Sequence, residues 1–559
     1  MPIEVKYPGV YVEELPSSTH TITGVSTSIT AFVGRALKGP VDEAIMISSF
    51  REFQRTFGGL CRESYLGYSV SNFFNNGGSK AFIVRLFKES TYKDSPPSKT
   101  QITIGDLKFE AANEGSWGEN LSVEIDLNIS QQLVDKYKLD KDKMFNLAVQ
   151  KTDDKGRVVN AETYTNLTIE DLDTDEYHNE LRVDKVLQDQ SILLRYKVGE
   201  ELPSDFSTVK TLAKSGKVNH SVIESIDSIK KKIDGLSKDK KDEKKALEKQ
   251  LITLKSSDGE PLDADCFIGP GKKDSHESIY ALEDIEPQIF NLMCIPPYKG
   301  EDVDPEVVNK AAEYCEKKRA FLIVDPPSSW NNVKDAKNGL SKIGTDSANA
   351  ALYFPRVTGP DPLDNYQTKE FAPSGVIAGV IARTDEAKGL WKAPAGVEAV
   401  LQGVEPSIRL TDEDNGELNP LGINCIRQFP VYGNVVWGAR TLQGADTLQS
   451  EWKYINVRRL TLYIEQSLQE GTRWAVFEPN DEALWSNLRS SITNFMNGLW
   501  TSGAFAGSSA DSAYFVKVDA TTTTQRDIDQ GVVNIVVGIA PIKPAEFIIL
   551  QIQQRAGQI

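Results

Sequence analysis

The chain has little of the side-chain chemistry on which most enzymes and metal sites depend. Its 559 residues include only four histidines, all isolated: His20, His178, His220 and His276. They form no H-E-x-x-H motif, and no G-x-S-x-G nucleophile elbow is present to pair with a histidine base. These absences argue against zinc-protease and triad-hydrolase chemistry.

A recognisable phosphate-binding loop is also missing. The stretch Gly269-Pro270-Gly271-Lys272-Lys273 resembles one at first, but two positions do not fit. A P-loop needs serine or threonine where Lys273 stands, and glycine where Cys266 stands. The sequence therefore offers no nucleotide site of this kind.

Cysteine is scarce and scattered. The five residues are odd in number and contain no C-x-x-C pair: Cys61, Cys266, Cys294, Cys315 and Cys425. This predicts reduced, mostly buried thiols in a protein made in the cytosol. Residues 1–6 lack the hydrophobic core of a secretory signal. We therefore expect release from the cell only by lysis or as part of a particle.

Long apolar runs and positive charge are lacking as well. No run reaches the roughly 18 residues of a membrane span, which argues against direct membrane insertion. The formal net charge is −17, which disfavours nucleic acid as the main partner because phosphate contact needs a basic surface. What is present, 40% hydrophobic and 26% charged residues, is ordinary for a globular protein. The length suggests roughly three to four domains.

Two stretches predict α/β structure. The first has strands over 28–34, 44–47 and 81–86, with helices that begin near Phe50 and Tyr65 between them. The second runs from 287 to 354 as a β-α-β-α-β pattern, which implies a mostly parallel sheet with covering helices. Asp325 ends a strand there, but no matching histidine, cysteine or carboxylate accompanies it. Capping of a helix or turn is the better interpretation of this residue.

The stretch between these two differs from both. After a linker at 95–98, apolar residues alternate strictly at 121–129, and further strands are expected near 146–150, 163–169 and 191–196. Residues 221–255 instead space their apolar side chains by three or four, with a break near Gly235. They hold ten lysines against seven acidic residues, so a solvated helical hairpin is favoured over a basic binding patch.

The region after 354 continues with alternating elements. Ser374–Arg383 is predicted as a small-residue helix able to pack closely against another backbone, because Gly375, Ala378 and Gly379 are small. A helix follows Tyr454, and residues 474–480 suggest a strand and turn. Asp481 caps a long amphipathic helix, after which strands are expected over 513–518 and 532–539.

Both ends of the sequence predict short strands. The apolar positions of the first alternate with charged ones around a Pro8-Gly9 break: Ile3, Val5, Tyr7, Val10, Tyr11 and Val12. The last, at 545–554, contains Phe547, Ile548, Ile549, Leu550 and Ile552. Each is either an edge strand of its own domain or a strand that joins the sheet of another subunit.

Several motifs in order make the chain similar to a known family. It resembles the contractile tail sheath proteins of phages, R-type pyocins and phage-like extracellular injection systems, over about residues 5–120 and 280–554. The motifs are Tyr7-Pro8-Gly9-Val10-Tyr11-Val12-Glu13-Glu14, Phe32-Val33-Gly34, Phe73-Phe74-Asn75-Asn76-Gly77-Gly78, Asn349-Ala350-Ala351-Leu352-Tyr353-Phe354-Pro355, Ala372-Pro373-Ser374-Gly375, Trp391-Lys392-Ala393-Pro394-Ala395-Gly396 and Val436-Trp437-Gly438-Ala439-Arg440-Thr441-Leu442.

Together, the resemblance and the patterns imply a multi-domain α/β (α+β) protein. A discontinuous α/β core is interrupted by a β-rich insertion that carries the helical hairpin, and extended strand arms stand at both termini. The expected segments are an N-terminal arm (1–23), a first core segment (24–98), the outward-facing insertion (99–275), an α/β core segment (276–420), a C-terminal core domain (421–540) and a C-terminal arm (541–559).

The resemblance implies a structural, non-enzymatic role without cofactor or metal. Such subunits stack as hexameric rings around an inner tube and contract to drive the tube through a target envelope. The expected partners are the chain itself, the tube, baseplate and terminal cap proteins, with assembly in the bacterial cytoplasm. The arms of two subunits would add strands to the sheet of a third, with hinges at 17–23 and 540–543. Asp481, Glu482 and Arg489 are candidates to face the tube.

Other classes predict different behaviour. A soluble α/β enzyme would be monodisperse and show turnover, whereas a nucleic-acid binder would show salt-dependent binding. Within the resemblance, a phage tail and an injection system are equally compatible with the sequence. A type VI sheath is disfavoured because it divides these regions between two chains.

Overall fold

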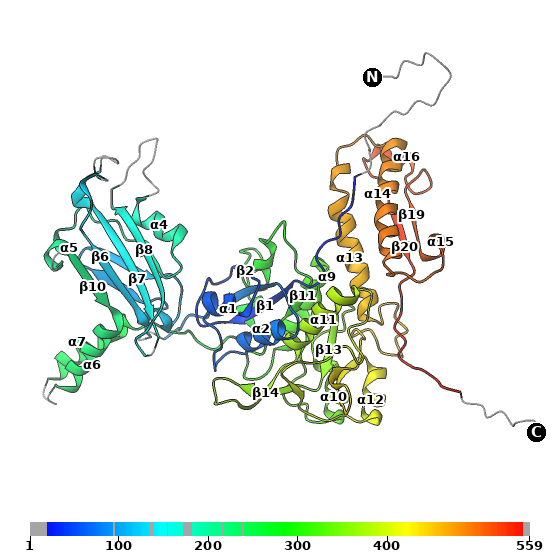
Figure 1. Ribbon diagram of the computed structural model, residues 1–559, viewed down its shortest axis with the longest axis horizontal. Coiled ribbons are helices and arrows are strands. Elements are labelled where there is room, and N and C mark those ends of the chain that lie inside the picture. The colour runs from blue at the N-terminus through cyan, green and yellow to red at the C-terminus, as the bar shows by residue number, and fades with distance from the viewer. Residues whose placement is uncertain are drawn as a thin grey trace, which may run out of the picture.

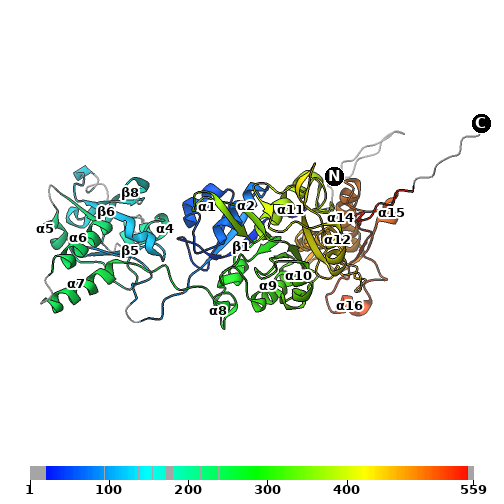
Figure 2. The ribbon, with the colours of Figure 1, turned by 90° about the horizontal axis from the view of Figure 1, so that it is seen from below.

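The computed structural model describes residues 20–92, 95–132, 134, 139–153, 155–170, 181–213, 216–236 and 240–551. Three parts follow one another along the longest axis of the molecule (Figures 1 and 2). The insertion lies at one end, the α/β core in the middle, and a helical C-terminal part at the other end.

The core is built on an eight-stranded sheet in the order β18-β17-β13-β12-β11-β1-β3-β2. Its six inner strands run parallel, and β18 and β2 close the edges as antiparallel strands. The parallel strands are almost wholly apolar because helices cover both faces of such a sheet. The strands are β1 (Thr30–Arg35), β2 (Ala44–Ile47), β3 (Ala81–Leu86), β11 (Leu292–Cys294), β12 (Phe321–Val324), β13 (Ala350–Phe354), β17 (Ile423–Phe429) and β18 (Gly433–Val436).

Each face of this sheet has its own hydrophobic core. One face packs against α1 (Phe50–Phe57), α2 (Leu66–Asn75) and α11 (Ser374–Lys388). The other packs against α8 (Ala264–Ile268), α9 (Pro305–Lys318), α10 (Val333–Gly339) and α12 (Asp412–Leu418). A small sheet of β14 (Val357–Asp361), β15 (Gln367–Phe371) and β16 (Glu405–Pro406) adjoins the core.

The small-residue helix α11 packs backbone to backbone on α2, as its composition predicts. A Cβ atom added at Gly375 would lie 2.3 Å from the carbonyl oxygen of Ser69, and one at Gly379 would lie 2.5 Å from that of Phe73. Only glycine fits at both positions, because a backbone oxygen cannot move aside as the end of a side chain can. The two helices thus join the N-terminal and later core segments.

The insertion folds around a main core of its own, with a small second apolar cluster in the same part. Its larger sheet is β10-β6-β7-β8, with β6 (Leu121–Asp126), β7 (Met144–Thr152), β8 (Val158–Thr168) and β10 (Lys217–Ser221). Its smaller sheet contains β4 (Gln101–Ile104), β5 (Leu107–Ala111) and β9 (Leu194–Tyr196), and the helices include α4 (Val183–Gln190) and α5 (Ser207–Leu212). The predicted hairpin is present as α6 (Val222–Asp234) and α7 (Lys241–Leu254), with several exposed ion pairs along it.

The C-terminal part consists of two long helices and a two-stranded sheet. The helices are α13 (Ile455–Gly471) and α14 (Glu482–Thr501), and the antiparallel strands are β19 (Tyr514–Lys517) and β20 (Val536–Ile539), with short helices α15 (Ala510–Ala513) and α16 (Gln525–Asp529). β17 and β18, which follow residue 420, continue the main sheet instead of joining these helices.

Several expected strands differ from the structure, and the one expected over 532–539 begins only at Val536. The strand expected at 474–480 is wrong: Arg473–Ala475 forms a 3₁₀ helix directly after α13, and Phe477 has a φ of 72°. The strand expected from Pro287 is shorter, because β11 begins only at Leu292. Before it, the Asn291 amide donates to the carbonyl of Ile29, and the Asn291 side chain accepts a hydrogen bond from the Ile29 amide.

Candidate assembly interface

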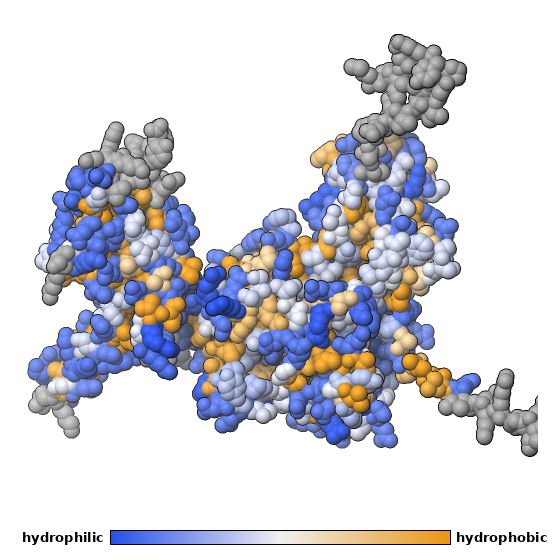
Figure 3. Space-filling view, viewed as in Figure 1, coloured by the Kyte–Doolittle hydropathy of each residue, from blue (hydrophilic) through white to orange (hydrophobic). Residues whose placement is uncertain are grey.

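The most exposed apolar run among the described residues is Phe547–Leu550. These four consecutive side chains are 74–83% exposed, and residues 542–551 belong to no strand of the same chain. Figure 3 shows them as a hydrophobic patch on the segment that leaves the body of the molecule. Scattered exposed apolar residues are common, whereas a contiguous exposed run of this kind is typical of a binding segment.

The segment before this run is held in place. The Ala540 amide donates to the carbonyl of Ala513, and the Ala540 carbonyl accepts from the Ala506 amide. Pro541 forms an isolated antiparallel β-bridge with Phe505. Asn456, in the first turn of α13, then donates to the carbonyl of Ile542 at 3.0 Å. These contacts tie residues 540–542 to the C-terminal part in this structure, and the hinge expected at 540–543 stays a prediction.

Glu546, the last residue before the exposed run, is held by side chains of the core. Its carboxylate accepts two hydrogen bonds from the buried Arg440 guanidinium, from Nε at 2.8 Å and from Nη2 at 2.6 Å. The Tyr454 hydroxyl donates a third at 3.3 Å. Partial burial by itself would raise the pKa of Glu546, but the hydrogen bonds and charge of Arg440 hold that pKa below its ordinary value.

A second open feature is the sheet of β19 and β20. Among the described strands, each of these two pairs only with the other. One face packs on α14 through side chains that include Tyr514, Val516, Val537 and Ile539. Ala540 directs its amide to Ala513, so by the alternation of an antiparallel pair Val537 and Ile539 direct theirs away from β19. The outer edge of β20 is thus available to a further strand.

The outer face of this small sheet is apolar too. Phe515 and Val536 are about half exposed there, and the Phe515 ring lies over Gly538 on the neighbouring strand. A strand of four residues with free edges is marginal by itself in water. Added strands would pair the free edges and bury the apolar face.

The start of the described chain runs along α13. Ile22 packs against Gly471, and the Val25 amide donates to the hydroxyl of Ser467. His20 stacks on Trp474, with ring centroids 4.0 Å apart. The predicted N-terminal strand residues, Ile3, Val5, Tyr7, Val10, Tyr11 and Val12, lie outside the described residues, as does Ile552.

The two described ends therefore leave from opposite ends of α13 (Figure 1). His20 lies beside Trp474, just after the helix, whereas Glu546 contacts Tyr454, just before it. A helix of this length spans about 25 Å at 1.5 Å per residue. Segments that extend from these two points reach in different directions from one molecule.

The residues predicted to face a tube lie together at the start of α14. Asp481 is the N-cap and accepts the Leu484 amide at 2.9 Å. Glu482 and Arg489 are 3.8 Å apart, and Arg489 also donates to the Val518 carbonyl. Sequence reasoning missed the neighbouring Val476 and Phe477, which are strongly exposed. The left-handed φ of Phe477 is rare for an aromatic residue, and no sequence signal indicated it.

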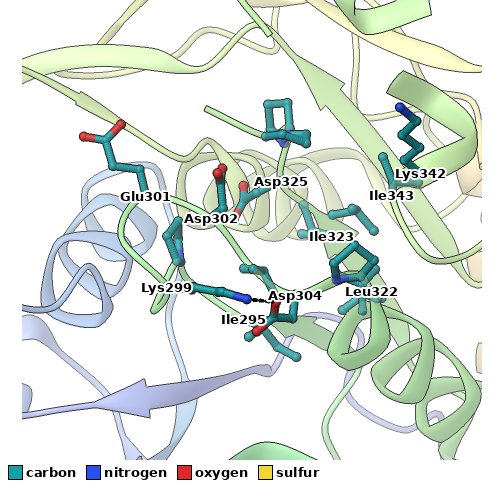
Figure 4. Close-up of a pocket in the computed structure, with 17 residues that line it drawn as sticks. Ile295, Lys299, Glu301, Asp302, Asp304, Leu322, Ile323, Asp325, Lys342 and Ile343 are labelled. Atoms are coloured by element: carbon teal, nitrogen blue, oxygen red, sulfur yellow. Dashed lines mark hydrogen bonds and ion pairs between the residues drawn. The ribbon is translucent and has the colours of Figure 1, made fainter. Parts of the chain in front are cut away.

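The place where an α/β enzyme would hold its catalytic groups is occupied by structural contacts (Figure 4). A cavity of about 360 Å³ at the end of β12 is lined by Asp302, Asp304 and Asp325. Asp325 accepts the amide and hydroxyl of Ser374, both at 2.7 Å, and so caps α11. This confirms the capping interpretation.

The other two carboxylates of this cavity also have protein donors. Asp302 accepts the Ser328 amide and hydroxyl, and Asp304 is bonded by Tyr298 and Lys299. Among the residues that the structure describes, no cluster of three metal-ligating side chains occurs. Within the same residues, no helix combines the length and apolar character needed to cross a bilayer.

Two family models match this chain. The phage tail sheath protein central domain matches residues 271–442, and the phage tail sheath C-terminal domain matches residues 448–555, so together they span half of the sequence. The tail sheath protein of Vibrio phage KVP40 is 26% identical over 239 residues, 42% of this chain and 34% of that protein. That of Enterobacteria phage T4 is 26% identical over 176 residues, 31% of this chain and 25% of that protein. The chain thus spans at most about a third of these relatives.

Solved structures show the same fold over nearly the whole chain. The sheath complex of an extracellular contractile injection system, PVC, in the contracted state is 23% identical, with a TM-score of 0.54 and 99% of both chains covered. The contracted helical sheath of the anti-feeding prophage is 23% identical, with a TM-score of 0.51 and coverage of 99% and 100%. A sheath tail protein from Listeria innocua is 12% identical, with a TM-score of 0.53 and coverage of 93% and 96%.

These likenesses define the class first: the chain has the mixed α/β, multi-domain fold of sheath proteins. The sequence matches then add the family. The chain belongs to the phage tail sheath family.

Proposed function

We propose that this chain is the repeating subunit of a contractile sheath. Subunits stack as hexameric rings around an inner tube, are held by a baseplate and a terminal cap, and contract to drive the tube through a target envelope. The particle is a phage tail or an injection system assembled in the bacterial cytoplasm. The observation that carries the proposal is the apolar run Phe547–Leu550, which is exposed and unpaired within its own chain.

The run has the properties of a donor strand. Phe547, Ile548, Ile549 and Leu550 have strand-forming side chains and no proline among them, so their backbone is free to pair. The β19–β20 sheet of another subunit has the matching acceptor edges. Each backbone hydrogen bond formed there contributes about 0.5–1.5 kcal/mol net, and the buried apolar side chains add to this.

The N-terminal segment supplies the second link. It leaves at His20 from the end of α13 opposite to Glu546, and the sequence of residues 3–12 has a strand pattern of its own. Two donor segments and one acceptor sheet in each subunit suffice for a continuous mesh. Such a mesh lets subunits rotate as rigid bodies without separating.

Truncation combined with electron microscopy tests this function. The full chain at high concentration should form long hollow tubes in negative stain. A chain that ends at Glu546 should keep its far-UV circular dichroism and melting transition but form no tubes. Replacing Tyr366, an exposed residue at the β14–β15 turn, with serine is a matched surface control that should still polymerise. Normal tubes from the truncated chain would contradict the donor role.

The energy of contraction is stored in the lattice. Assembly on a tube traps an extended, metastable arrangement, and contraction releases free energy as new subunit contacts form. Differential scanning calorimetry of extended particles should therefore show an exothermic transition without ATP. A requirement for ATP would contradict this part of the proposal.

A further inference from the structure

Arg440 is the most completely enclosed charged side chain at the root of the C-terminal segment. The residue is fully buried and lies four positions after the end of β18 in the main sheet. Its Nη1 donates to the carbonyls of Asn419 and Gly444 and to the carboxylate of Asp446, at 2.9–3.1 Å. These contacts hold the guanidinium in one orientation, with Nε and Nη2 directed at Glu546.

Within the described part of the terminal segment, residues 541–551, Glu546 is the partner of this arginine. Its side chain is 16% exposed, whereas the Asp446 side chain is 48% exposed. A bidentate arginine–carboxylate pair fixes both distance and angle, so it holds a segment more rigidly than a single bond does. A buried guanidinium that loses such a partner is left with unpaired donors, which disfavours release of Glu546.

We infer that Arg440 anchors the C-terminal arm through Glu546, so that only the residues from Phe547 onward pass to another subunit. This inference rests on the proposed sheath function. The anchor makes the exit point of the arm a fixed feature of the core, and bending is confined to the peptide after Glu546. Arg440 and Glu546 are thus positioning residues that set where the donor strand of one subunit meets the sheet of the next.

The anchor joins the arm to two parts of the molecule at once. Arg440 lies next to the main sheet, where its amide donates to Asn424 of β17, and Tyr454 and Asn456 stand at the start of α13. A pull on the donor strand is therefore passed to both the sheet and α13. An arm attached only through its backbone would pass the pull to the β19–β20 sheet alone.

Distance measurements in the unpolymerised full chain test the anchor without reference to assembly. Nitroxide labels at Ala545→Cys, next to the anchor, and Glu413→Cys, exposed on α12, report the position of the arm by pulsed electron resonance. The half-buried Cys61 and Cys266 are replaced by serine to avoid extra labels. We expect one narrow distance peak, which broadens strongly in Glu546→Ala and partly in Glu546→Gln.

A matched charge control is Glu386→Gln, an exposed position on α11 that should leave the peak narrow. The wild-type far-UV circular dichroism spectrum and a single cooperative melting transition verify that each variant is folded. The melting temperature of Glu546→Ala is expected to be lower, because Arg440 loses its bidentate partner. A distribution of label-to-label distances that is already broad in the wild type would contradict the anchor. So would a distribution that stays narrow in Glu546→Ala.

Assembly is the second readout. Tubes of Glu546→Ala should be fewer and less regular in helical order than those of the wild type and of Glu386→Gln. Equal yield and order in all three, despite a released arm in the distance measurement, would overturn the positioning role. If the wild type itself forms no tubes, the sheath function fails, while the distance measurement still decides whether the anchor exists.

Discussion

Asp385 and Arg459 form a buried, bidentate ion pair that ties α11 to α13. The two bonds are 2.9 and 2.6 Å long, and both side chains are at most 4% exposed. Arg459 also donates to the carbonyl of Thr27 at 2.7 Å, so the pair joins the N-terminal segment to the core and to the C-terminal part. Three stretches that are far apart in sequence meet at one guanidinium.

The first prediction concerns this pair. Asp385→Asn should lower the free energy of unfolding by about 3–5 kcal/mol, because it leaves Arg459 buried without its counter-charge. Guanidinium denaturation of the soluble chain measures the loss. The exposed pair Lys337–Glu417 provides the control, since Lys337→Met should leave the transition midpoint where it is. Equal effects of the two substitutions would show that the buried pair has no special role.

The second prediction concerns the contact between α11 and α2. Gly375→Ala should destabilise the core by about 1–3 kcal/mol or more, because the new methyl group meets the Ser69 carbonyl oxygen. Gly498→Ala, at an exposed position of α14 with no atom near the added carbon, should instead stabilise the chain by about 0.5–1 kcal/mol. Thermal melting compares the two, and a Gly375→Ala protein as stable as the wild type would contradict the close packing.

The third prediction concerns pH. Burial raises the pKa of Asp325 from its ordinary value of 3.8 to about 6, against the opposing hydrogen bonds from Ser374. The folded state then binds the proton more tightly than the unfolded state. The contribution of this group to stability is therefore present below about pH 4 and is lost as the pH rises to 6, by about 3 kcal/mol.

Asp325→Asn isolates this effect, because asparagine cannot ionise yet still accepts the Ser374 amide. The stability of the variant relative to the wild type should increase between pH 4 and pH 7 and then stay constant. Melting curves of both proteins across that range provide the measurement. A stability difference between variant and wild type that does not change with pH would show that the pKa of Asp325 is not raised.

The fourth prediction concerns the acceptor sheet. A synthetic peptide of residues 545–559 should bind the chain truncated after Glu546 and should block polymerisation of the full chain, because it occupies the free strand edge. The same peptide with Ile549→Pro should do neither, since proline removes a backbone donor from the strand. Fluorescence anisotropy measures binding, and equal binding of both peptides would point to a contact other than strand addition.

Much of the architecture can be predicted from local patterns. The β-α-β-α-β run, the helix at Asp304–Lys318 and the helical hairpin of the insertion all follow from hydrophobic spacing and capping residues near in sequence. The contact of α11 with a neighbouring backbone was also predictable, because its small residues leave no other way to fill the space. The Phe547–Leu550 run had a recognisable strand pattern, although the pattern alone left open whether it pairs within its own domain or with another subunit.

Other features depend on pairs that no local pattern specifies. β1 lies beside β11, although more than 250 residues separate Thr30 from Leu292. The expected strand at 474–480 was wrong because the chain continues from α13 into a 3₁₀ turn, and backbone geometry there overrides the propensity of Val476 and Phe477.

The sequence by itself determined the family, most of the element order and the presence of an apolar run with a strand pattern near the C-terminus, because each depends on residues close together in the chain. Only the tertiary structure showed that Glu546, directly before this run, is held by the core. Nothing near Glu546 in the sequence indicates a special role for it. Folding brings Arg440, 106 positions away, within hydrogen-bond distance. The physical reason is burial. A guanidinium enclosed by the core needs a carboxylate in contact with it, and which carboxylate that is depends on the folded chain and not on distance in the sequence.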